Sequence, residues 1–473
     1  MSRETDATPT TPETNKQIPH FSRTLGLIPA IAINMTQICG IGPFITIPLI
    51  VATMGGPQAL LGWVVGAILV MCDGLVWAEL GAAMPGAGGT YIYLREAFQY
   101  RTGRLMPFLF IWTVMLTIPL IMSTGVIGMV NYLGYYFPNM NWWEIHGISL
   151  LATGLVIFVL YRNISSIGII TTILWIVMLI TVGGVILAAF THFNPRLAFS
   201  FPHGAWKIGG PFFSGLGAGL LIAVYDYLGY NTTAYMAEEL RDPGRVLPRS
   251  IIYSILGMMA IYLVMNVGVM GVLPWQQVAK SSSIGSAVLE HTWGKTAAII
   301  FTGLIIITAF ASVLTGLLGG SRLPYHAAKD KVFLPIFGRL HPQLNFPHVS
   351  LITMGVITAI GSFIDLDDVF NLLMALTVLV PSIGQIIALT VLRRRQPNLR
   401  RPYRMLWYPI PGIVAAAGWL YIFEASGKMV ILLSLAWLAL GIIAFLIWAK
   451  LEKQWPFGPK EIREEFSQIG GQA

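Results

Sequence analysis

The sequence reads TLGLIPAIAINMTQICGIGPFITIPLIVATMGGPQALLGWVVGAILVMC over residues 24–72, and these 49 residues include no Lys, Arg, Asp or Glu. A helix needs about 20 apolar residues to cross the hydrocarbon core of a bilayer, so this run is long enough for two helices. Lipid offers the main chain no hydrogen-bond partners, which leaves helices or closed barrels. Because the run does not alternate and is far longer than a barrel strand, it predicts two membrane-spanning helices.

The composition of the whole chain extends this prediction. Of the 473 residues, 55% are hydrophobic and only 11% are charged, which is far more apolar than a soluble domain of this size needs. We therefore expect an all-α polytopic membrane protein. The two cysteines, Cys39 and Cys72, both fall inside apolar runs, so a disulfide framework is not indicated. Twelve spans are predicted, near residues 25–51, 57–83, 106–136, 144–161, 167–190, 210–238, 250–273, 297–320, 347–364, 368–392, 406–425 and 429–449.

The basic residues predict the orientation of the chain. Of the 29 Lys and Arg residues, five fall in the predicted outer loops, namely Arg196, Lys207, Lys280, Lys295 and Lys428. Basic residues concentrate in cytoplasmic loops, so both termini are expected in the cytoplasm of a multi-pass cell-membrane protein. The net charge of +8 is then explained by the orientation of the chain in the membrane, and nucleic-acid binding is not needed to explain it. Membrane lipid is the expected partner of the chain. Residues 1–22, polar and rich in Thr and Pro, are predicted to be a disordered cytoplasmic tail.

Asp226 is the only charged residue between Lys207 and Glu238, and it lies near the middle of the sixth predicted span. The surrounding residues, 223–233, read AVYDYLGYNTT, where plain leucines would suit lipid better. A carboxylate at membrane depth is costly, and such groups mark functional sites. The alternative is an acid that neighbouring hydroxyl groups satisfy and that has no role in transport.

Two predicted spans carry helix-breaking residues near their centres. Residues 39–44 read CGIGPF, in which two glycines weaken a helix and Pro43 removes a main-chain donor. Because proline suits the first turn of a helix, the first span should unwind at 40–42 and restart at Pro43. The sixth span should break around 226–229. Breaks five helices apart suggest a five-plus-five inverted repeat with a midplane site, although glycine notches and proline kinks also serve packing.

Four stretches resemble one family of transporters. They read GIGPF at 40–44, AELGAAMPGAGGTYIY at 78–93, AEELRDP at 237–243 followed by LPR at 247–249, and GGSR at 319–322 followed by AAKD at 327–330 and LP at 334–335. In order and spacing they resemble the amino acid–polyamine–organocation (APC) superfamily, of the amino acid permease type. Members of this superfamily carry different substrates, so the resemblance leaves the substrate open.

The resemblance implies a LeuT-like fold, the five-plus-five repeat with two extra C-terminal helices. Residues 23–393 would form the transport core, 394–452 the last two spans and 453–473 a cytoplasmic tail. Main-chain groups at the first break would hold the carboxylate of a substrate, and the sixth span would surround its amine, with Tyr225 or Tyr230 closing over it. The substrate-binding residues implied are Cys39, Gly40, Ile41, Gly42, Tyr225, Asp226, Tyr227, Gly229 and Tyr230.

The chain also departs from family patterns. Ile41 stands where many amino acid carriers have Ser, and Pro43 removes one carboxylate donor. Several proton-coupled members carry a Lys in the fifth span, and residues 171–190 contain none. Polyamines need several anionic contacts, yet the third span, 107–136, has no acid. One midplane carboxylate therefore favours an amino acid or small amine.

Other polar residues are weaker candidates for coupling. Glu79 is a second possible coupling acid beside Asp226, although its place near a helix end favours a structural role. Asp73 lies deeper, where it could pair with a basic group of a cytoplasmic loop. Ser312 and Thr315, three residues apart, are a possible sodium site, although such hydroxyls more often bond to their own helix. The histidines show no spacing typical of a metal site.

The sequence as a whole predicts a secondary active transporter of amino acids or related small amines that works by alternating access. The substrate is a small molecule, the coupling ion a proton or sodium with the proton favoured, and no cofactor is expected. Alternatives are a polyamine or organic-cation transporter, an amine exchanger, and a membrane amino acid sensor that does not transport. The sequence has no phosphate-binding loop, so ATP-driven transport is not indicated. It also has no nucleophile–base set at membrane depth, so an enzyme is not indicated.

Overall fold

A computed structural model describes residues 25–86, 88–161, 167–235, 237, 240–344 and 346–457. The predicted N-terminal tail, 1–22, and most of the predicted C-terminal tail, 458–473, lie outside these residues. The described chain is helical apart from its loops and an isolated bridge between Leu25 and Leu240. The expectation of an all-helical protein is confirmed for this part of the chain.

The helices follow the predicted spans in order. The first two spans correspond to α1 (Leu27–Cys39) with α2 (Gly42–Met54), and to α3 (Ala59–Ala83). The next are α5 (Leu105–Leu133), α6 (Trp142–Leu160), α7 (Ile167–Thr191), and α9 (Gly210–Tyr227) with α10 (Thr232–Tyr235). The remaining spans are α11 (Pro243–Val272), α14 (Lys295–Gly320), α16 (His348–Gly361), α17 (Leu366–Thr377) continuing through η4 (Val378–Gly384) into α18 (Gln385–Arg395), α19 (Ile410–Ala425) and α20 (Lys428–Leu451).

Shorter helices occupy the connections between these spans. They are α4 (Thr90–Thr102), α8 (Pro195–Ala198), α12 (Trp275–Val278), α13 (Ile284–Trp293), α15 (Arg322–Lys329) and η3 (Pro335–Gly338).

Seven of the described helices are long and apolar enough to cross a membrane, and an eighth span results if the bent pair α1 and α2 is counted as one. Three shorter apolar helices, Trp175–Thr191, His348–Gly361 and Ile410–Ala425, coincide with further predicted spans. The membrane-spanning character of the chain is thus evident. The count of twelve and the inverted repeat stay predictions.

The first span is broken where the glycines and the proline predict it. Helix α1 ends at Cys39, Gly40 has a φ of 28°, and α2 begins at Gly42 with Pro43 in its first turn. The two helices are bent by 48° relative to each other. A positive φ favours glycine, and proline is tolerated in a first turn because no main-chain donor is needed there.

The sixth span breaks slightly later than predicted. Helix α9 continues through Asp226 to Tyr227, Leu228 is extended, and Gly229 has a φ of 109° before α10 starts at Thr232. The side chain of Asn34 in α1 accepts a hydrogen bond of 3.0 Å from the main-chain N–H of Thr233, which satisfies one free donor of α10. Asp226 is therefore the penultimate residue of a half-helix.

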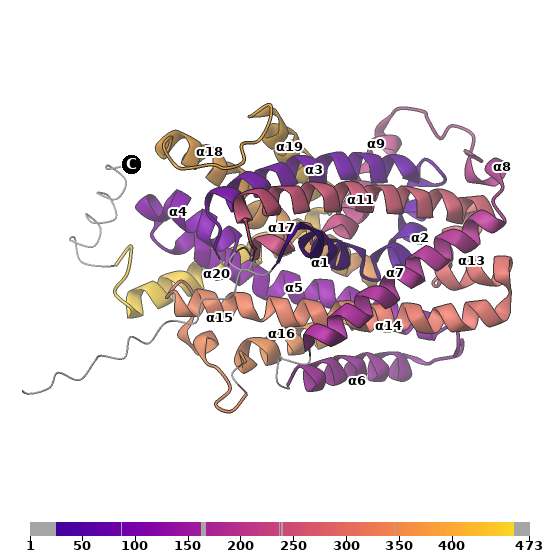
Figure 1. The fold of residues 1–473 in the computed structure, drawn as a ribbon, viewed down its shortest axis with the longest axis horizontal. Coiled ribbons are helices and arrows are strands. Elements are labelled where there is room, and N and C mark those ends of the chain that lie inside the picture. Colours follow the sequence, from indigo (N-terminus) through magenta and orange to yellow (C-terminus); the bar gives the residue numbers. More distant parts are fainter. Residues whose placement is uncertain are drawn as a thin grey trace, which may run out of the picture.

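Helix α1 lies inside the bundle (Figure 1). Helices α3 and α11 run along one side of it, and α5 and α14 run along the other. Helix α3 packs along α11, and α5 packs along α14, so the two broken spans are enclosed by long unbroken helices. The core thus surrounds the two breaks, while α6 lies at the lower edge of the bundle in this view and both α6 and α20 are largely exposed along their length.

Candidate functional site

The two helix breaks lie against each other. A Cβ atom built on Gly229 would come within 2.9 Å of the Cβ of Gln37, 3.0 Å of its carbonyl carbon and 3.2 Å of the nitrogen of Ile38. Only a glycine allows the main chain of the sixth span to approach α1 this closely. The predicted site residue Gly229 therefore sets the contact between the broken spans.

Tyr262 of α11 joins the ends of both half-helices. Its hydroxyl group lies 2.9 Å from the carbonyl oxygen of Ile38 and 3.1 Å from that of Asp226. Both carbonyls belong to last turns, where no intrahelical donor remains. A single hydroxyl proton thus serves one carbonyl from each break, and the Tyr262 side chain is fully buried among aromatic neighbours.

Asp226 projects from the end of α9 towards the start of α2. Its side chain is only 1% exposed, and its Oδ2 accepts a hydrogen bond from the hydroxyl of Thr46, in the second turn of α2. The same hydroxyl lies 3.0 Å from the carbonyl oxygen of Gly42. The other oxygen, Oδ1, has no hydrogen-bond partner among the described residues. A buried acceptor without a partner is costly, so this oxygen is poised to receive a donor.

Glycines at the first break make room for polar groups. A Cβ on Gly42 would overlap Oδ1 of Asp226, and a Cβ on Gly40 would come within 2.8 Å of Oγ of Ser312. Cys39 and Ile41 are buried, and Ile41 packs on Gly128 of α5. The start of α2 carries the partial positive charge of a helix N-terminus, which favours the Asp226 carboxylate beside it.

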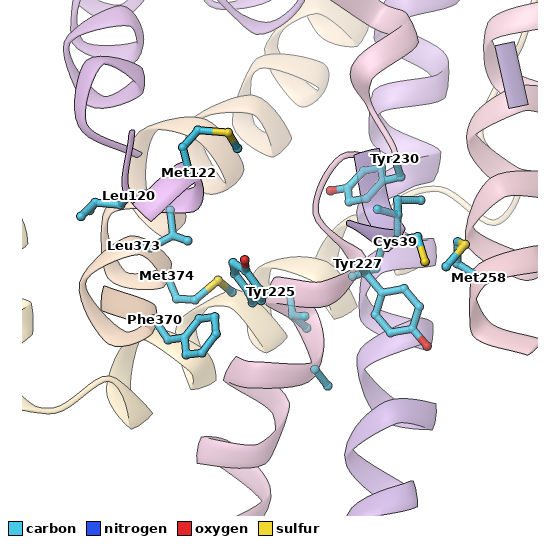
Figure 2. Packing of buried hydrophobic residues seen from close by; sticks show 14 of the residues in the cluster. Cys39, Leu120, Met122, Tyr225, Tyr227, Tyr230, Met258, Phe370, Leu373 and Met374 are labelled. Atoms are coloured by element: carbon cyan, nitrogen blue, oxygen red, sulfur yellow. The ribbon is translucent and has the colours of Figure 1, made fainter. Parts of the chain in front are cut away.

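The predicted aromatic residues of the sixth span face different neighbours (Figure 2). Tyr225 points to the side of Phe370 and Met374 of α17. Its ring meets that of Phe370 edge to face, with the ring centroids 4.4 Å apart. Its hydroxyl lies 2.5 Å from Oγ1 of Thr124 in α5. Tyr227 lies on the other side, where its ring packs against Trp63 and Tyr262. The adjacent residues Asp226 and Tyr225 are thus both buried, Asp226 against α2 and Tyr225 against α5 and α17.

Tyr230 lies away from Tyr225 and against α3. Its hydroxyl donates to Oδ2 of Asp73, while Oδ1 of Asp73 accepts a hydrogen bond of 3.2 Å from the indole N–H of Trp419. The basic partner suggested for Asp73 is therefore not the one that the structure shows. Neutral donors hold the carboxylate instead, among them Tyr230 of the sixth-span break and Trp419 of α19.

Glu79 lies six residues further along α3 in a network of ion pairs. Arg393 donates to both carboxylate oxygens, at 2.8 and 2.5 Å, and Arg401 lies 3.5 Å from Oε1. The main-chain N–H of Met405 adds a hydrogen bond of 2.8 Å. Burial lowers the pKa of the Arg401 guanidinium, and the charge of Glu79 raises it. Glu79 thus ties α3 to α18 and to the loop before α19.

The two predicted sodium ligands differ in what their hydroxyl groups contact. The hydroxyl of Thr315 donates to the carbonyl of Ala311, at 2.9 Å, in its own helix, while Ser312 approaches Gly40 at the first break. Ser312 is therefore the member of the pair that reaches the broken span. Within the described residues, no group of three or more His, Cys, Asp or Glu side chains is arranged to hold a metal ion.

Several residues that complete the site were not predicted from the sequence. Thr46, Tyr262, Thr124 and Phe370 contact Asp226 or Tyr225, and Asn34 caps α10. Thr46 lies four residues after Gly42, so its place in the second half-helix was an available signal. Tyr262 had a weaker one, because a tyrosine within an apolar span usually finds a partner for its hydroxyl group.

The broken spans, the buried carboxylate between them and the enclosing apolar helices define a membrane transport protein. The chain belongs to the amino acid permease family, whose family model matches residues 25–456. Membership of this family identifies it as a transporter that acts in amino acid transport, a class whose members are not enzymes.

Individual relatives cover most of the chain at low identity. The branched-chain amino acid permease BcaP of Bacillus subtilis (strain 168) is 25% identical over 457 residues, covering 91% of this chain and 94% of that protein. The serine/threonine exchanger SteT of the same strain is 24% identical over 423 residues, covering 86% and 91%. Asc-type amino acid transporter 1 of Mus musculus is 28% identical over 401 residues, covering 81% and 73%.

Proposed function

We propose that this chain is a secondary active transporter, coupled to protons, that moves amino acids or related small amines across the cell membrane by alternating access. Twelve spans with both termini in the cytoplasm form the proposed framework. The broken spans one and six would move against the other helices and expose the site to each side in turn. Substrate would bind at 39–42 and 225–230.

The observation that carries this proposal is the unpaired, buried Oδ1 of Asp226 beside the start of α2. A carboxylate at membrane depth needs a partner, and an ammonium group supplies both charge and hydrogen-bond donors. Thr46 already occupies Oδ2, so Asp226 offers one free oxygen to a substrate. One such contact suits one ammonium group better than the several cationic centres of a polyamine.

The position of Asp226 bears on the rest of the substrate. Its carboxylate lies against Gly42, where the family resemblance places the carboxylate of an amino acid substrate. Two carboxylates at one helix start repel each other unless a cation or a proton lies between them. An α-amino acid meets this requirement, because its ammonium group is adjacent to its carboxylate and can neutralise Asp226.

Apolar and aromatic side chains would enclose the remainder of the substrate. Tyr225 and Phe370 contact each other edge to face, and Thr124 holds the hydroxyl of Tyr225. This contact joins the sixth span to α5 and α17, so it closes the interior on that side. A small apolar side chain would fit against these rings, which supports neutral amino acids as the first substrates to test.

Exchange of one amine for another is the second function to consider. Proton and ammonium compete for the same free oxygen of Asp226, so each can replace the other during a transport cycle. A carrier with this carboxylate alone would favour exchange, whereas net uptake with a proton needs a second protonatable group. The fifth span supplies no lysine between residues 171 and 190 for that purpose.

Binding and transport are tested in sequence. Purified protein is screened by thermal shift against the common L-amino acids, putrescine and spermidine, since a compound that binds only the folded state raises the apparent stability. Counterflow is then measured in proteoliposomes preloaded with an unlabelled mixture of L-amino acids, with the same mixture supplied outside in radiolabelled form. Stabilisation and counterflow are expected for amino acids.

Each outcome separates the competing functions. Stabilisation by amino acids without counterflow would identify a sensor. Stabilisation by spermidine alone would identify a polyamine carrier. Asp226→Asn is the site variant, and Asp368→Asn, an exposed acid at the start of α17, is the matched control.

A further inference from the structure

Asp73 is a second buried carboxylate that the proposed substrate site does not use. It lies in the middle of α3 and is 1% exposed. The hydroxyl of Tyr230 donates to Oδ2, and the indole N–H of Trp419 lies 3.2 Å from Oδ1. These donors come from the sixth-span break and from α19, so three parts of the bundle meet at this acid.

The neutral partners of Asp73 distinguish it from Glu79. Six residues separate the two acids, which corresponds to about 9 Å along a helix. Glu79 is held by Arg393 and Arg401, so a proton on Glu79 would leave two partly buried guanidinium groups without their counter-charge. A proton on Asp73 breaks no ion pair, because the carboxyl oxygen atoms still accept hydrogen bonds from neutral donors.

Few other titratable groups face Asp73. Tyr230 approaches it from the sixth span, and Cys72 is its neighbour on α3. Trp77 lies one turn along the same helix, and Trp419 comes from α19; neither indole carries a charge. Among the described residues of α9, α11, α18 and α19, which pack against α3, no Lys, Arg or His forms an ion pair with Asp73. The net charge around Asp73 therefore changes when the Asp73 carboxylate gains or loses a proton.

The sixth-span break connects Asp73 to the substrate site. Tyr230 follows Gly229 directly, and Gly229 packs on the main chain of Gln37 and Ile38 in α1. Asp226 lies four residues before Tyr230 in the same segment. A movement of the break on substrate binding would therefore displace the Tyr230 hydroxyl that covers Asp73 and open the carboxylate to water.

We propose that Asp73, covered by Tyr230 and Trp419, is the site that binds the transported proton. This inference rests on the proposed function as a secondary active transporter. In the cycle, the Asp73 carboxylate accepts a proton from water on one side of the membrane when Tyr230 withdraws. It releases the proton to water on the other side after the broken spans have changed position. No other bond is made or broken.

The test compares Asp73→Asn with the unmodified protein in proteoliposomes. One assay measures proton entry with a pH-sensitive dye inside the vesicles after addition of a mixture of the common L-amino acids. The other measures counterflow of the radiolabelled amino acid mixture, which needs no net proton movement. Asp73→Asn should reduce amino acid-induced proton entry to the level of empty vesicles while counterflow persists. Asp73→Glu should recover proton entry.

A second variant keeps the result interpretable if Asp73→Asn folds poorly. Trp419→Phe removes the hydrogen bond to Oδ1 and retains the carboxylate, so proton entry should persist. If Asp73→Asn and Trp419→Phe lose both activities to the same extent, Asp73 has only a structural role and the inference is overturned. Proton entry unchanged in a folded Asp73→Asn protein overturns it as well.

The unmodified protein separates this inference from the proposed function. If it shows neither stabilisation nor counterflow with amino acids or amines, the proposed function fails. If it shows counterflow without amino acid-induced proton entry, transport stands and only the proton site at Asp73 is refuted.

Discussion

The hydroxyl group of Tyr262 lies 3.1 Å from the carbonyl oxygen of Asp226 and also reaches the carbonyl of Ile38, at 2.9 Å. One side chain of an unbroken helix thus holds the ends of both broken spans. The contact links the stability of the site to α11.

Tyr262→Phe should destabilise the protein. The substitution leaves the carbonyl oxygens of Ile38 and Asp226 without this donor, and an unsatisfied buried group costs about 1–3 kcal/mol. We expect a lower midpoint of thermal unfolding in detergent, measured by intrinsic tryptophan fluorescence. Tyr253→Phe, a half-exposed tyrosine of the same helix, is the control and should leave the midpoint unchanged. Equal midpoints for the two variants would show that the Tyr262 hydroxyl adds no stability.

Gly42→Val should abolish amino acid uptake while the protein remains folded. The first atom of the new side chain would overlap Oδ1 of Asp226, which blocks both the carboxylate and the approach of a substrate. Uptake in whole cells and size-exclusion profiles measure the two properties separately. Gly154→Val on the exposed face of α6, where a Cβ meets no neighbour within 4 Å, is the matched control. Normal uptake by Gly42→Val would reduce this glycine to a packing residue.

Asp226→Asn should weaken the binding of amines and flatten the pH dependence of transport. Asparagine retains the size of the side chain and loses the negative charge that both the ammonium group and the proton would seek. The thermal shift by amino acids is expected to fall, and uptake measured across a pH series should vary less than in the unmodified protein. An unaltered shift together with an unaltered pH series would return Asp226 to a purely structural role.

Glu79→Gln should destabilise the protein by about 3 kcal/mol, because removal of one member of a buried ion pair leaves the others without counter-charge. The Arg401 side chain is nearly buried, so it would feel the loss of this counter-charge strongly. A double-mutant cycle with Arg393→Met isolates the direct pair from other effects. A coupling free energy near zero would mean that the bidentate contact between Glu79 and Arg393 makes no net contribution.

The predicted orientation is tested by cysteine labelling in intact cells. Lys280→Cys and Lys428→Cys should react with a membrane-impermeant maleimide added outside, because the distribution of Lys and Arg places these loops outside. Arg400→Cys, in the predicted cytoplasmic loop, should react only after the membrane is permeabilised. The opposite pattern would overturn the assignment of both termini to the cytoplasm.

Local chemistry explains why the helix breaks were predictable. Gly40, Gly42 and Pro43 disfavour a continuous helix whatever surrounds them, and the structure places a break at these residues. The sixth span breaks one to two residues later than expected, because Asp226 still follows helical geometry and the left-handed φ falls on Gly229. Main-chain preferences of single residues are readable without tertiary information.

The partners of the buried acids were not predictable in the same way. A basic residue was suggested as a partner for Asp73, yet Tyr230 and Trp419 supply its hydrogen bonds. Trp419 is 346 residues away in the sequence, and no local pattern indicates which face of α19 meets α3. For Glu79, the place near a helix end suggested a structural role. It did not indicate that Arg393 and Arg401 would be the partners.

The contact of Gly229 with α1 has a consequence for genetics. A larger residue at 229 would collide with the carbonyl carbon of Gln37 and the nitrogen of Ile38, which every amino acid carries. No exchange of the Gln37 side chain can therefore relieve the collision completely. In a selection for second-site suppressors of Gly229→Ala, compensating mutations at Gln37 should be absent, and recovery should arise by reversion of codon 229 itself.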